Sequence, residues 1–263
     1  IWTPWFAVFG SKSGFDSLEE CFEDYTQYIY AVETGLSSDP VMNWRVSSLD
    51  NVALLSNSDS HSLEKIGREA NVFDTEVSYG GILDAIKTKD PTKFLYTIEF
   101  FPEEGKYHFD GHRDCNISLH PQESQKNNNM CSVCNRPLTI GVLARVEELA
   151  DRAEGEKPEV AIPYKSLIPL AEIIADVLHK GVSTKTVRTE YDALLKAFPN
   201  EFAVLLDADL GDISKVTLPE IAEGVKRVRE GNVQIEPGYD GEYGKIEIFG
   251  ENEQPKSNQA SLL

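Results

Sequence analysis

The sequence is poor in basic residues. Lys and Arg number 25 against 44 Asp and Glu, so the 263-residue chain carries a formal net charge of −19. Because attraction to a phosphate backbone depends on Lys and Arg, this balance excludes broad, nonspecific binding to nucleic acid. Any contact with DNA must therefore use local basic patches or metal ions.

Long apolar runs are also absent. The run from Ile1 to Phe9 is short and contains Pro4, and it has neither the basic start nor the cleavage site of a signal peptide. We therefore expect a cytoplasmic protein with no membrane partner. Hydrophobic residues make up 41% of the chain, enough for the core of one large domain or two modest ones.

Cysteines are too few and too unevenly spaced for a disulfide framework. Cys21 stands alone, whereas the other three gather around one polar loop as the pairs His112-x2-Cys115 and Cys131-x2-Cys134. Two short-spaced pairs, each from one turn, are what a tetrahedral zinc site uses. Four such ligands leave no open position, so the predicted zinc is structural. His108 is an alternative fourth ligand, which the x2 spacing disfavours.

A second group of candidate ligands follows apolar runs. Asp59 and His61 come after the run at 52–55, and Glu33 ends the run before it. If the chain stays extended, Asp59 and His61 point to the same side and can share a metal ion. Active sites of parallel barrels lie at the carboxyl ends of strands. We therefore predict that these three residues are catalytic, with Asp59 and His61 as metal ligands; the alternative is a surface turn with a capping Asp.

The pattern of apolar residues predicts an α/β protein. Buried strands are expected at 28–32 and 52–55, with helices at 18–25 and 63–70, and such βα units favour a largely parallel sheet or barrel. Ser17 and Glu20 form a capping box for the first helix. Further expected elements are a hairpin of 94–101 with 106–109, helices at 138–152, 167–178, 185–197 and 218–229, and a hairpin within 233–249.

These elements predict four segments. They are a catalytic barrel part at 1–100, a zinc-binding subdomain with its helix at 101–155, a helical domain with a terminal hairpin at 156–250, and a disordered tail at 251–263.

Residues that contact DNA are harder to assign from sequence. Lys12, Arg45 and Arg68 are the basic residues that we predict to bind phosphates, although most such side chains are simply solvated. The aromatic residues of the first nine positions either stack on bases or belong to the core: Trp2, Trp5, Phe6 and Phe9.

Several short runs, in this order, resemble the endonuclease Q family of the PHP (polymerase and histidinol phosphatase) superfamily. They span nearly the whole chain: WTPWF (2–6), FGSKSGFD (9–16), ETGLSSDP (33–40), NWR (43–45), SNSDSH (56–61), DGHR (110–113), LTIGVL (138–143) and EPGYDG (236–241).

The resemblance implies a fold and an activity. The fold is the C-terminal part of a distorted βα barrel, followed by a zinc-binding hairpin and a mainly helical region. The activity is metal-dependent nicking of DNA on the 5′ side of deaminated bases, uracil and hypoxanthine, and of abasic sites. Damaged DNA would be the partner, and catalytic Zn, Mg or Mn ions would act beside the structural zinc. In this superfamily the D-x-H pair supplies metal ligands, which places Asp59 and His61 in that role.

The sequence departs from this family at its beginning. The H-x-H motif of the superfamily belongs to a segment before Ile1, so we expect an N-terminally truncated fragment that does not nick DNA. The alternative from a different class is a non-catalytic, zinc-containing DNA-binding or scaffold protein.

Overall fold

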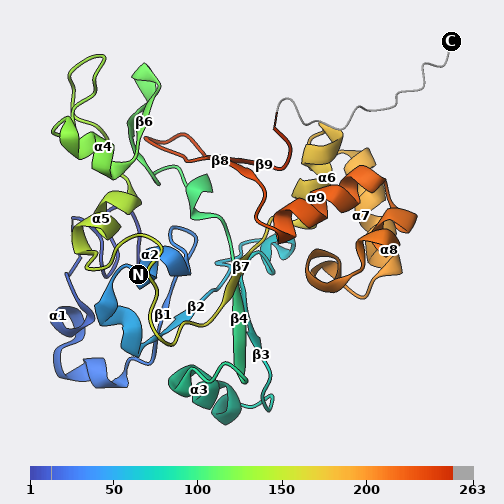
Figure 1. Ribbon diagram of the computed structural model, residues 1–263, viewed down its shortest axis with the longest axis horizontal. Helices are drawn as coiled ribbons and strands as arrows, with labels where there is room; N and C mark the ends of the chain where they lie inside the picture. Colours follow the sequence, from blue (N-terminus) through green and yellow to red (C-terminus); the bar gives the residue numbers. More distant parts are fainter. Residues whose placement is uncertain (13, 251–263) are drawn as a thin grey trace. The chain divides into compact units, whose positions relative to one another are not determined.

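The computed structural model describes residues 1–12 and 14–250, and these residues fold into two compact units (Figure 1). Among the described residues, the first unit is Ile1–Lys165 with Glu236–Lys245, and the second is Ser166–Ile235 with 246–250. Helices and strands both occur, which confirms the α/β class. The predicted domain boundaries at 100 and 155 stay predictions, and the predicted tail at 251–263 lies outside the described residues.

Three small sheets of the first unit position the candidate site. Strands β1 (Ala31–Glu33) and β2 (Ala53–Leu55) run parallel. Strand β4 (Phe94–Glu99) lies between its antiparallel neighbour β3 (Ala70–Phe73) and β7 (Tyr164–Ser166). Strands β5 (Asp110–His112) and β6 (Ile117–Leu119) are antiparallel. The expected parallel arrangement therefore holds for β1 and β2 but is wrong for β3 and β4.

The helices of the first unit are short. They are α1 (Leu18–Phe22), α2 (Pro40–Trp44), α3 (Tyr79–Thr88), α4 (Pro121–Lys126) and α5 (Val142–Leu149). Short 3₁₀ segments also occur in this unit, at Glu23–Tyr28, Ser47–Asn51, Leu63–Lys65, Pro102–Glu104 and Arg113–Cys115. The Ser17 hydroxyl accepts the N–H of Glu20, so the predicted cap of α1 is confirmed, and the Glu20 carboxylate reaches back to the N–H of Asp16.

The apolar start of the chain packs into the core of this unit. Trp2 and Phe9 are buried with Val142 and Val146 of α5, and their two rings meet edge to face at 5.0 Å. The Trp2 indole donates to the Oδ1 atom of buried Asn43 at 2.7 Å, so its polar atom is satisfied. The segment before β1 is thereby fixed against a helix more than 100 residues away in sequence.

The second unit is mainly helical. Its helices are α6 (Leu170–Leu178), α7 (Lys185–Ala197), α8 (Leu210–Val216) and α9 (Pro219–Arg229), with a π-helical turn at Ala203–Asp207. The helices predicted at 167–178, 185–197 and 218–229 are confirmed. Strands β8 (Gln234–Glu236) and β9 (Lys245–Glu247) pair, which confirms the hairpin within 233–249.

Helices α6 and α9 approach closely because α9 carries a glycine at the contact. A Cβ atom on Gly224 would lie 2.9 Å from a methyl group of Val177 and 3.2 Å from one of Ile173. Ile173, Ile221 and Val225 are fully buried. The apolar faces that the sequence pattern indicated thus form one core in this unit. Within the described part of the chain, no helix is both long and apolar enough to cross a bilayer.

Two predicted elements are wrong. The expected helix at 63–70 is a single 3₁₀ turn followed by β3, and Leu63 and Ile66, which suggested an apolar face, are exposed. Residues 106–109 do not pair with β4, because β3 and β7 already occupy both edges of that strand. Pro102 instead begins a 3₁₀ turn that leads the chain away.

Helix α3 was not expected from the sequence. Gly80 and Gly81 weaken helix propensity in its first turn, but the Ser78 hydroxyl caps it by accepting the N–H of Gly81 at 3.1 Å.

The buried contact between α6 and α9 generates a prediction about stability. Replacing Ile173 by Ala should lower the free energy of unfolding of the second unit by about 2–5 kcal/mol, since it leaves a cavity in a closed core. Chemical denaturation followed by circular dichroism measures this. Val182→Ala, at a half-exposed position of the same unit, is the control and should change stability little. Equal effects of the two substitutions would contradict the packing described.

Candidate functional site

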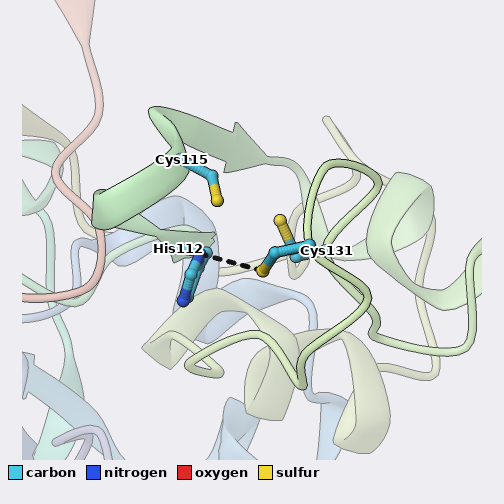
Figure 2. A group of neighbouring side chains, drawn as sticks. His112, Cys115 and Cys131 are labelled. Carbon is cyan, nitrogen blue, oxygen red and sulfur yellow. Dashed lines mark hydrogen bonds between the residues drawn. The ribbon is translucent and has the colours of Figure 1, made fainter.

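Four side chains converge at the predicted zinc site. One ligand atom from each of His112, Cys115, Cys131 and Cys134 lies within 4.8 Å of all the others. Figure 2 shows His112, Cys115 and Cys131 directed toward one another from two separate turns. Sγ of Cys134 lies 3.7 Å from Nδ1 of His112. In residues 1–12 and 14–250, this is the one group of three or more His, Cys, Asp or Glu side chains placed to hold a metal ion.

The two ligand turns have the same local design. The residue after each second ligand is an asparagine in the left-handed region, Asn116 with φ 53° and Asn135 with φ 56°. Asparagine tolerates this conformation better than most residues, and the positive φ reverses the chain direction at the end of each turn. The N–H of Asn135 donates to the Cys131 carbonyl at 2.9 Å, and the N–H of Asn116 donates to the Arg113 carbonyl at 3.0 Å.

The surroundings of two thiols shift their pKa values in opposite directions. Hydrogen bonds from the backbone of Cys134 lower the pKa of Cys131 to about 7, with the backbone of Val133 acting the same way. Burial and the neighbouring thiols raise the pKa of Cys115. A bound cation would favour the thiolate form of all three cysteines. Three sulfurs and one imidazole nitrogen suit a tetrahedral ion, so the residues fit a closed structural metal site.

His108 is not part of this group. Its ring is buried against Phe109 at a centroid distance of 5.6 Å, and its Nδ1 atom has no hydrogen-bond partner among the described residues. Burial lowers the pKa of His108 to about 4, so the ring is neutral at pH 7. The structure groups His112, which the x2 spacing favoured, with the three cysteines, and His108 lies outside that group.

The second predicted group lies at the ends of β1 and β2. Glu33 is the exposed last residue of β1 and stands opposite Leu55, the last residue of the parallel strand β2. Asp59 and His61 are exposed in the loop that follows β2. The backbone does not stay extended there, because Asp59 has φ 44° and its carbonyl oxygen lies 2.9 Å from Nδ1 of His61. Their roles as catalytic residues and metal ligands stay predictions.

The start of that loop is held by strand β3. The side chain of Asn71 accepts the N–H of Ser56 at 3.0 Å and donates to the carbonyl of Ser56 at 2.8 Å. The Arg68 guanidinium donates to the carbonyl of Ser58 at 2.9 Å. The Ser56 hydroxyl donates to the carbonyl of Ile98 on β4, at 2.6 Å. These contacts bring the ends of β2 and β4 together beside the predicted metal ligands.

A pair of buried glutamates at this place was missed by the sequence analysis. Ala70 pairs with Ile98 across β3 and β4, and the same register continued by one residue brings Glu69 opposite Glu99. Glu99 is fully buried and accepts hydrogen bonds from the hydroxyls of Thr34 and Thr97. Glu69 accepts a long bond from the N–H of Phe100, at 3.5 Å, and its Oε2 atom has no partner among the described residues.

Both glutamates resist ionisation. Burial, and then the charge of Glu99, raise the pKa of Glu69 to about 8. Burial raises the pKa of Glu99 to about 7, against the hydroxyl hydrogen bonds that favour its charged form. Carboxyl groups with such raised pKa values concentrate at functional sites. The pair can be recognised only from the register between β3 and β4, because the sequence around each Glu does not show that the other Glu lies opposite it.

The three basic residues predicted to bind DNA have different surroundings. Arg45 is nearly buried and pairs with Glu147 at 2.6 Å, while its Nε donates to the carbonyl of Arg152. Lys12 is exposed, with its Nζ 5.1 Å from the centre of the Trp5 ring. Arg68 is half-buried at the Ser58 loop. The DNA contacts stay predictions, and for Arg45 the internal ion pair competes with them.

The aromatic residues of the first nine positions divide into two kinds. Trp2 and Phe9 belong to the core, as described above. Trp5 packs on Tyr107 at 4.9 Å, and Phe6 is 68% exposed. Of the four, Phe6 and Trp5 are therefore the ones whose rings lie near the surface.

The Cys/His group predicts tight binding of one zinc ion per chain. Cys131→Ser should lose the metal, since it removes one of four ligands and a thiolate of lowered pKa. Elemental analysis of the purified protein measures this. Cys21→Ser, outside the group, is the control and should keep one zinc. A metal-free wild-type protein, or full zinc content in the Cys131→Ser variant, would contradict the assignment.

The glutamate pair predicts how stability depends on pH. In the folded chain Glu69 keeps its proton up to a pKa of about 8, whereas its ordinary value is 4.5. The protonated Glu69 therefore contributes fully to the free energy of unfolding below about pH 4.5, and this contribution is lost as the pH rises through 8. Glu69→Gln carries no such proton, so it should be more stable than the wild type at pH 8.5 and lose that advantage at low pH.

Denaturant unfolding of both proteins across this pH range measures the difference. Exposed Glu76→Gln serves as the control for a simple change of net charge. A stability difference between wild type and Glu69→Gln that does not change with pH would rule out the raised pKa.

Comparison with known proteins places the chain among relatives. Residues 169–232 match the MJ0043 C-terminal domain family. The chain is 38% identical over 251 residues to the uncharacterized protein MJ0043 of Methanocaldococcus jannaschii, covering 93% of this chain and 31% of that protein. It is 35% identical to the uncharacterized protein YqxK of Bacillus subtilis, covering 94% of this chain and 59% of that one. The chain thus spans less than two thirds of either relative.

Two solved structures are similar to almost the entire chain. One is the lesion-specific endonuclease PfuEndoQ from Pyrococcus furiosus, with a TM-score of 0.85, 33% identity, and coverage of 99% of this chain and 64% of that one. The other is endonuclease Q in complex with a 27-mer duplex with an abasic lesion at the active site, with a TM-score of 0.80, 33% identity, and coverage of 98% and 64%. Over nearly its whole length, the chain is therefore similar in fold and sequence to endonuclease Q, of which it spans 64%.

Proposed function

We propose that the complete protein is a metal-dependent endonuclease that nicks DNA on the 5′ side of abasic sites and of the deaminated bases uracil and hypoxanthine. The observation that carries this proposal is the similarity to endonuclease Q, one structure of which holds a duplex with an abasic lesion at its active site. The chain spans 64% of that protein, so the activity is proposed for the whole protein.

Residues 1–100 would form the C-terminal part of a distorted PHP barrel, with its active site at the ends of β1 and β2. Glu33, Asp59 and His61 lie there. Carboxylate oxygens and an imidazole are suitable ligands for Zn, Mg or Mn ions. Such ions lower the pKa of a bound water and neutralise charge on the phosphate under attack. The buried pair Glu69 and Glu99 lies nearby, because Thr34, the residue after Glu33, donates to Glu99, and this supports a site for proton and metal chemistry.

The two metal sites would have different tasks. The Cys/His group has a closed, sulfur-rich donor set, which favours a structural zinc ion that holds its two turns together. The oxygen-rich group at the strand ends is exposed and open to a substrate. Divalent ions at this second site also offer one way for a chain with a net charge of −19 to approach a phosphate backbone.

The chain of 263 residues by itself is proposed to be inactive. Glu33, Asp59 and His61 do not form a shared group of ligand atoms within the described residues, and three separated ligands cannot fix a catalytic ion. The same observation supports the alternative function, a non-catalytic zinc-containing protein that binds DNA or serves as a scaffold. The following experiment separates the two.

The test uses the protein at its full natural length with 5′-labelled duplexes that contain one abasic site, uracil or hypoxanthine. With Mg, Mn or Zn ions, the product should be one strand cut on the 5′ side of the lesion. Asp59→Ala should reduce the cleavage rate at least 100-fold by removing a metal ligand, while circular dichroism stays unchanged. Asp74→Ala, another exposed Asp that follows a strand, is the matched control and should cut normally.

Three outcomes are informative. Full cleavage by Asp59→Ala would place the active site elsewhere. Binding of lesion duplexes without any cut, with each metal, would favour the non-catalytic alternative. Cleavage by the 263-residue chain alone, surviving further purification and abolished by Asp59→Ala, would refute the proposed inactivity.

A further inference from the structure

The Glu236–Lys245 segment returns to the first unit and joins the residues that lead to the Cys/His group. The N–H groups of His108 and Phe109 both donate to the carbonyl of Gly238, at 3.1 and 2.9 Å. The N–H of Gly241 donates to the carbonyl of Lys106 at 3.0 Å. Backbone bonds therefore attach this segment to the stretch before His112, more than 120 residues earlier in the sequence.

Two contacts extend this attachment to the strand of the first ligand. The ring of Tyr239 lies against Gly111, where a Cβ atom would come within 2.3 Å of Cδ2 of that ring. Only a residue without a Cβ allows this approach next to His112. Gly111 in turn exchanges backbone hydrogen bonds with Thr139, at 2.9 and 2.8 Å. The first ligand, His112, is thus the last residue of strand β5, whose Gly111 is in contact with both Tyr239 and Thr139.

Asp240 connects these parts through its side chain. Its Oδ2 atom accepts the N–H of Arg113 at 2.8 Å, and its Oδ1 atom accepts the hydroxyl of Thr139 at 2.6 Å. Arg113 lies inside the first ligand turn, between His112 and Cys115. Thr139 follows the second turn, whose Cys131 N–H is held by the carbonyl of Arg136 at 2.8 Å. One carboxylate therefore bridges the backbone of the first ligand turn and the Thr139 side chain, which follows the second turn.

We propose that Asp240 is a positioning residue of the Cys/His metal site, and that the Glu236–Lys245 segment is part of the metal-binding module. The inference rests on metal binding by the Cys/His group and does not depend on nuclease activity. Partners outside the ligand shell that orient ligands commonly contribute 10- to 100-fold to metal affinity. By reciprocity, a metal ion that favours the ordered turns also favours docking of the segment.

The main test replaces Asp240 by Asn, which tolerates the left-handed backbone at this position, where φ is 43°, but cannot supply the charged acceptor for both bonds. Zinc affinity, measured by competition with a chromophoric chelator, should fall by about 10- to 100-fold. With Co²⁺ in place of zinc, the thiolate-to-metal absorption bands should shift, because the ligand turn is less well fixed. A change in global fold alone would not produce this spectral shift.

The matched control is Glu242→Gln. It removes the same charge from an exposed position of the same segment and should leave zinc affinity within about twofold of wild type. A second variant, Thr139→Val, keeps the shape of the side chain and removes the other bond to Asp240. It should weaken zinc binding as well, and the double variant should lose no more than the two single losses combined.

Hydrogen exchange tests the reciprocal effect. Chelation of the metal should speed exchange at the amides of Gly238, Tyr239 and Gly241, which lie in the segment and not in the ligand turns. Wild-type zinc affinity in both Asp240→Asn and Thr139→Val would overturn the proposal. Equal weakening by Glu242→Gln, or exchange in the segment that is unchanged by chelation, would also overturn it.

Discussion

The carboxyl ends of β1, β2 and β4 meet through one buried hydrogen-bond network, and the candidate active site depends on it. Glu99 accepts the hydroxyls of Thr34 and Thr97, and the Ser56 hydroxyl reaches the carbonyl of Ile98. These bonds join strands that share no single continuous sheet. Thr34 follows Glu33 directly, and Ser56 begins the loop of Asp59 and His61. The network therefore sets where the predicted metal ligands lie, although none of its members is itself a predicted ligand. Burial raises the pKa values of Glu99, which belongs to this network, and of Glu69 opposite it, and carboxyl groups with raised pKa values concentrate at functional sites.

The region around the Cys/His group has little apolar core to stabilise it. The β5–β6 pair and the two ligand turns bury few large apolar side chains, so hydrophobic packing alone gives this region little stability. A metal ion would replace that missing core by joining two turns that are 16 residues apart along the chain, from Cys115 to Cys131. The segment around Asp240 adds a third piece from much later in the sequence. Three short stretches that are separate in the sequence thus meet around the Cys/His group.

How far the sequence predicted these features depended on the range of the interaction. The Cys/His ligands repeat a local spacing, and the helices at 185–197 and 218–229 follow a local period, so both were found. The helix predicted at 63–70 was wrong because Leu63 and Ile66 match a helical period but remain exposed. The pairing of Glu69 with Glu99 and the bridge from Asp240 to Arg113 had no local signal, since they arise from strand register and from chain return over 127 residues. The direction of the chain after β2 could not be predicted from the residue pattern either. The turn there needs a positive φ at Asp59, and the presence of an Asp does not by itself indicate that conformation.

The central claim is that the complete protein holds two metal sites of different chemistry, a closed one of sulfur and nitrogen and an open one at the strand ends. Anomalous X-ray scattering from crystals of the protein at its full natural length, collected at the zinc and manganese absorption edges, tests this most directly. We predict a zinc peak among His112, Cys115, Cys131 and Cys134, and at least one further metal peak in contact with Asp59 and His61. A zinc peak at the cysteines with no metal near Asp59 and His61, in crystals soaked with manganese and zinc, would contradict the account.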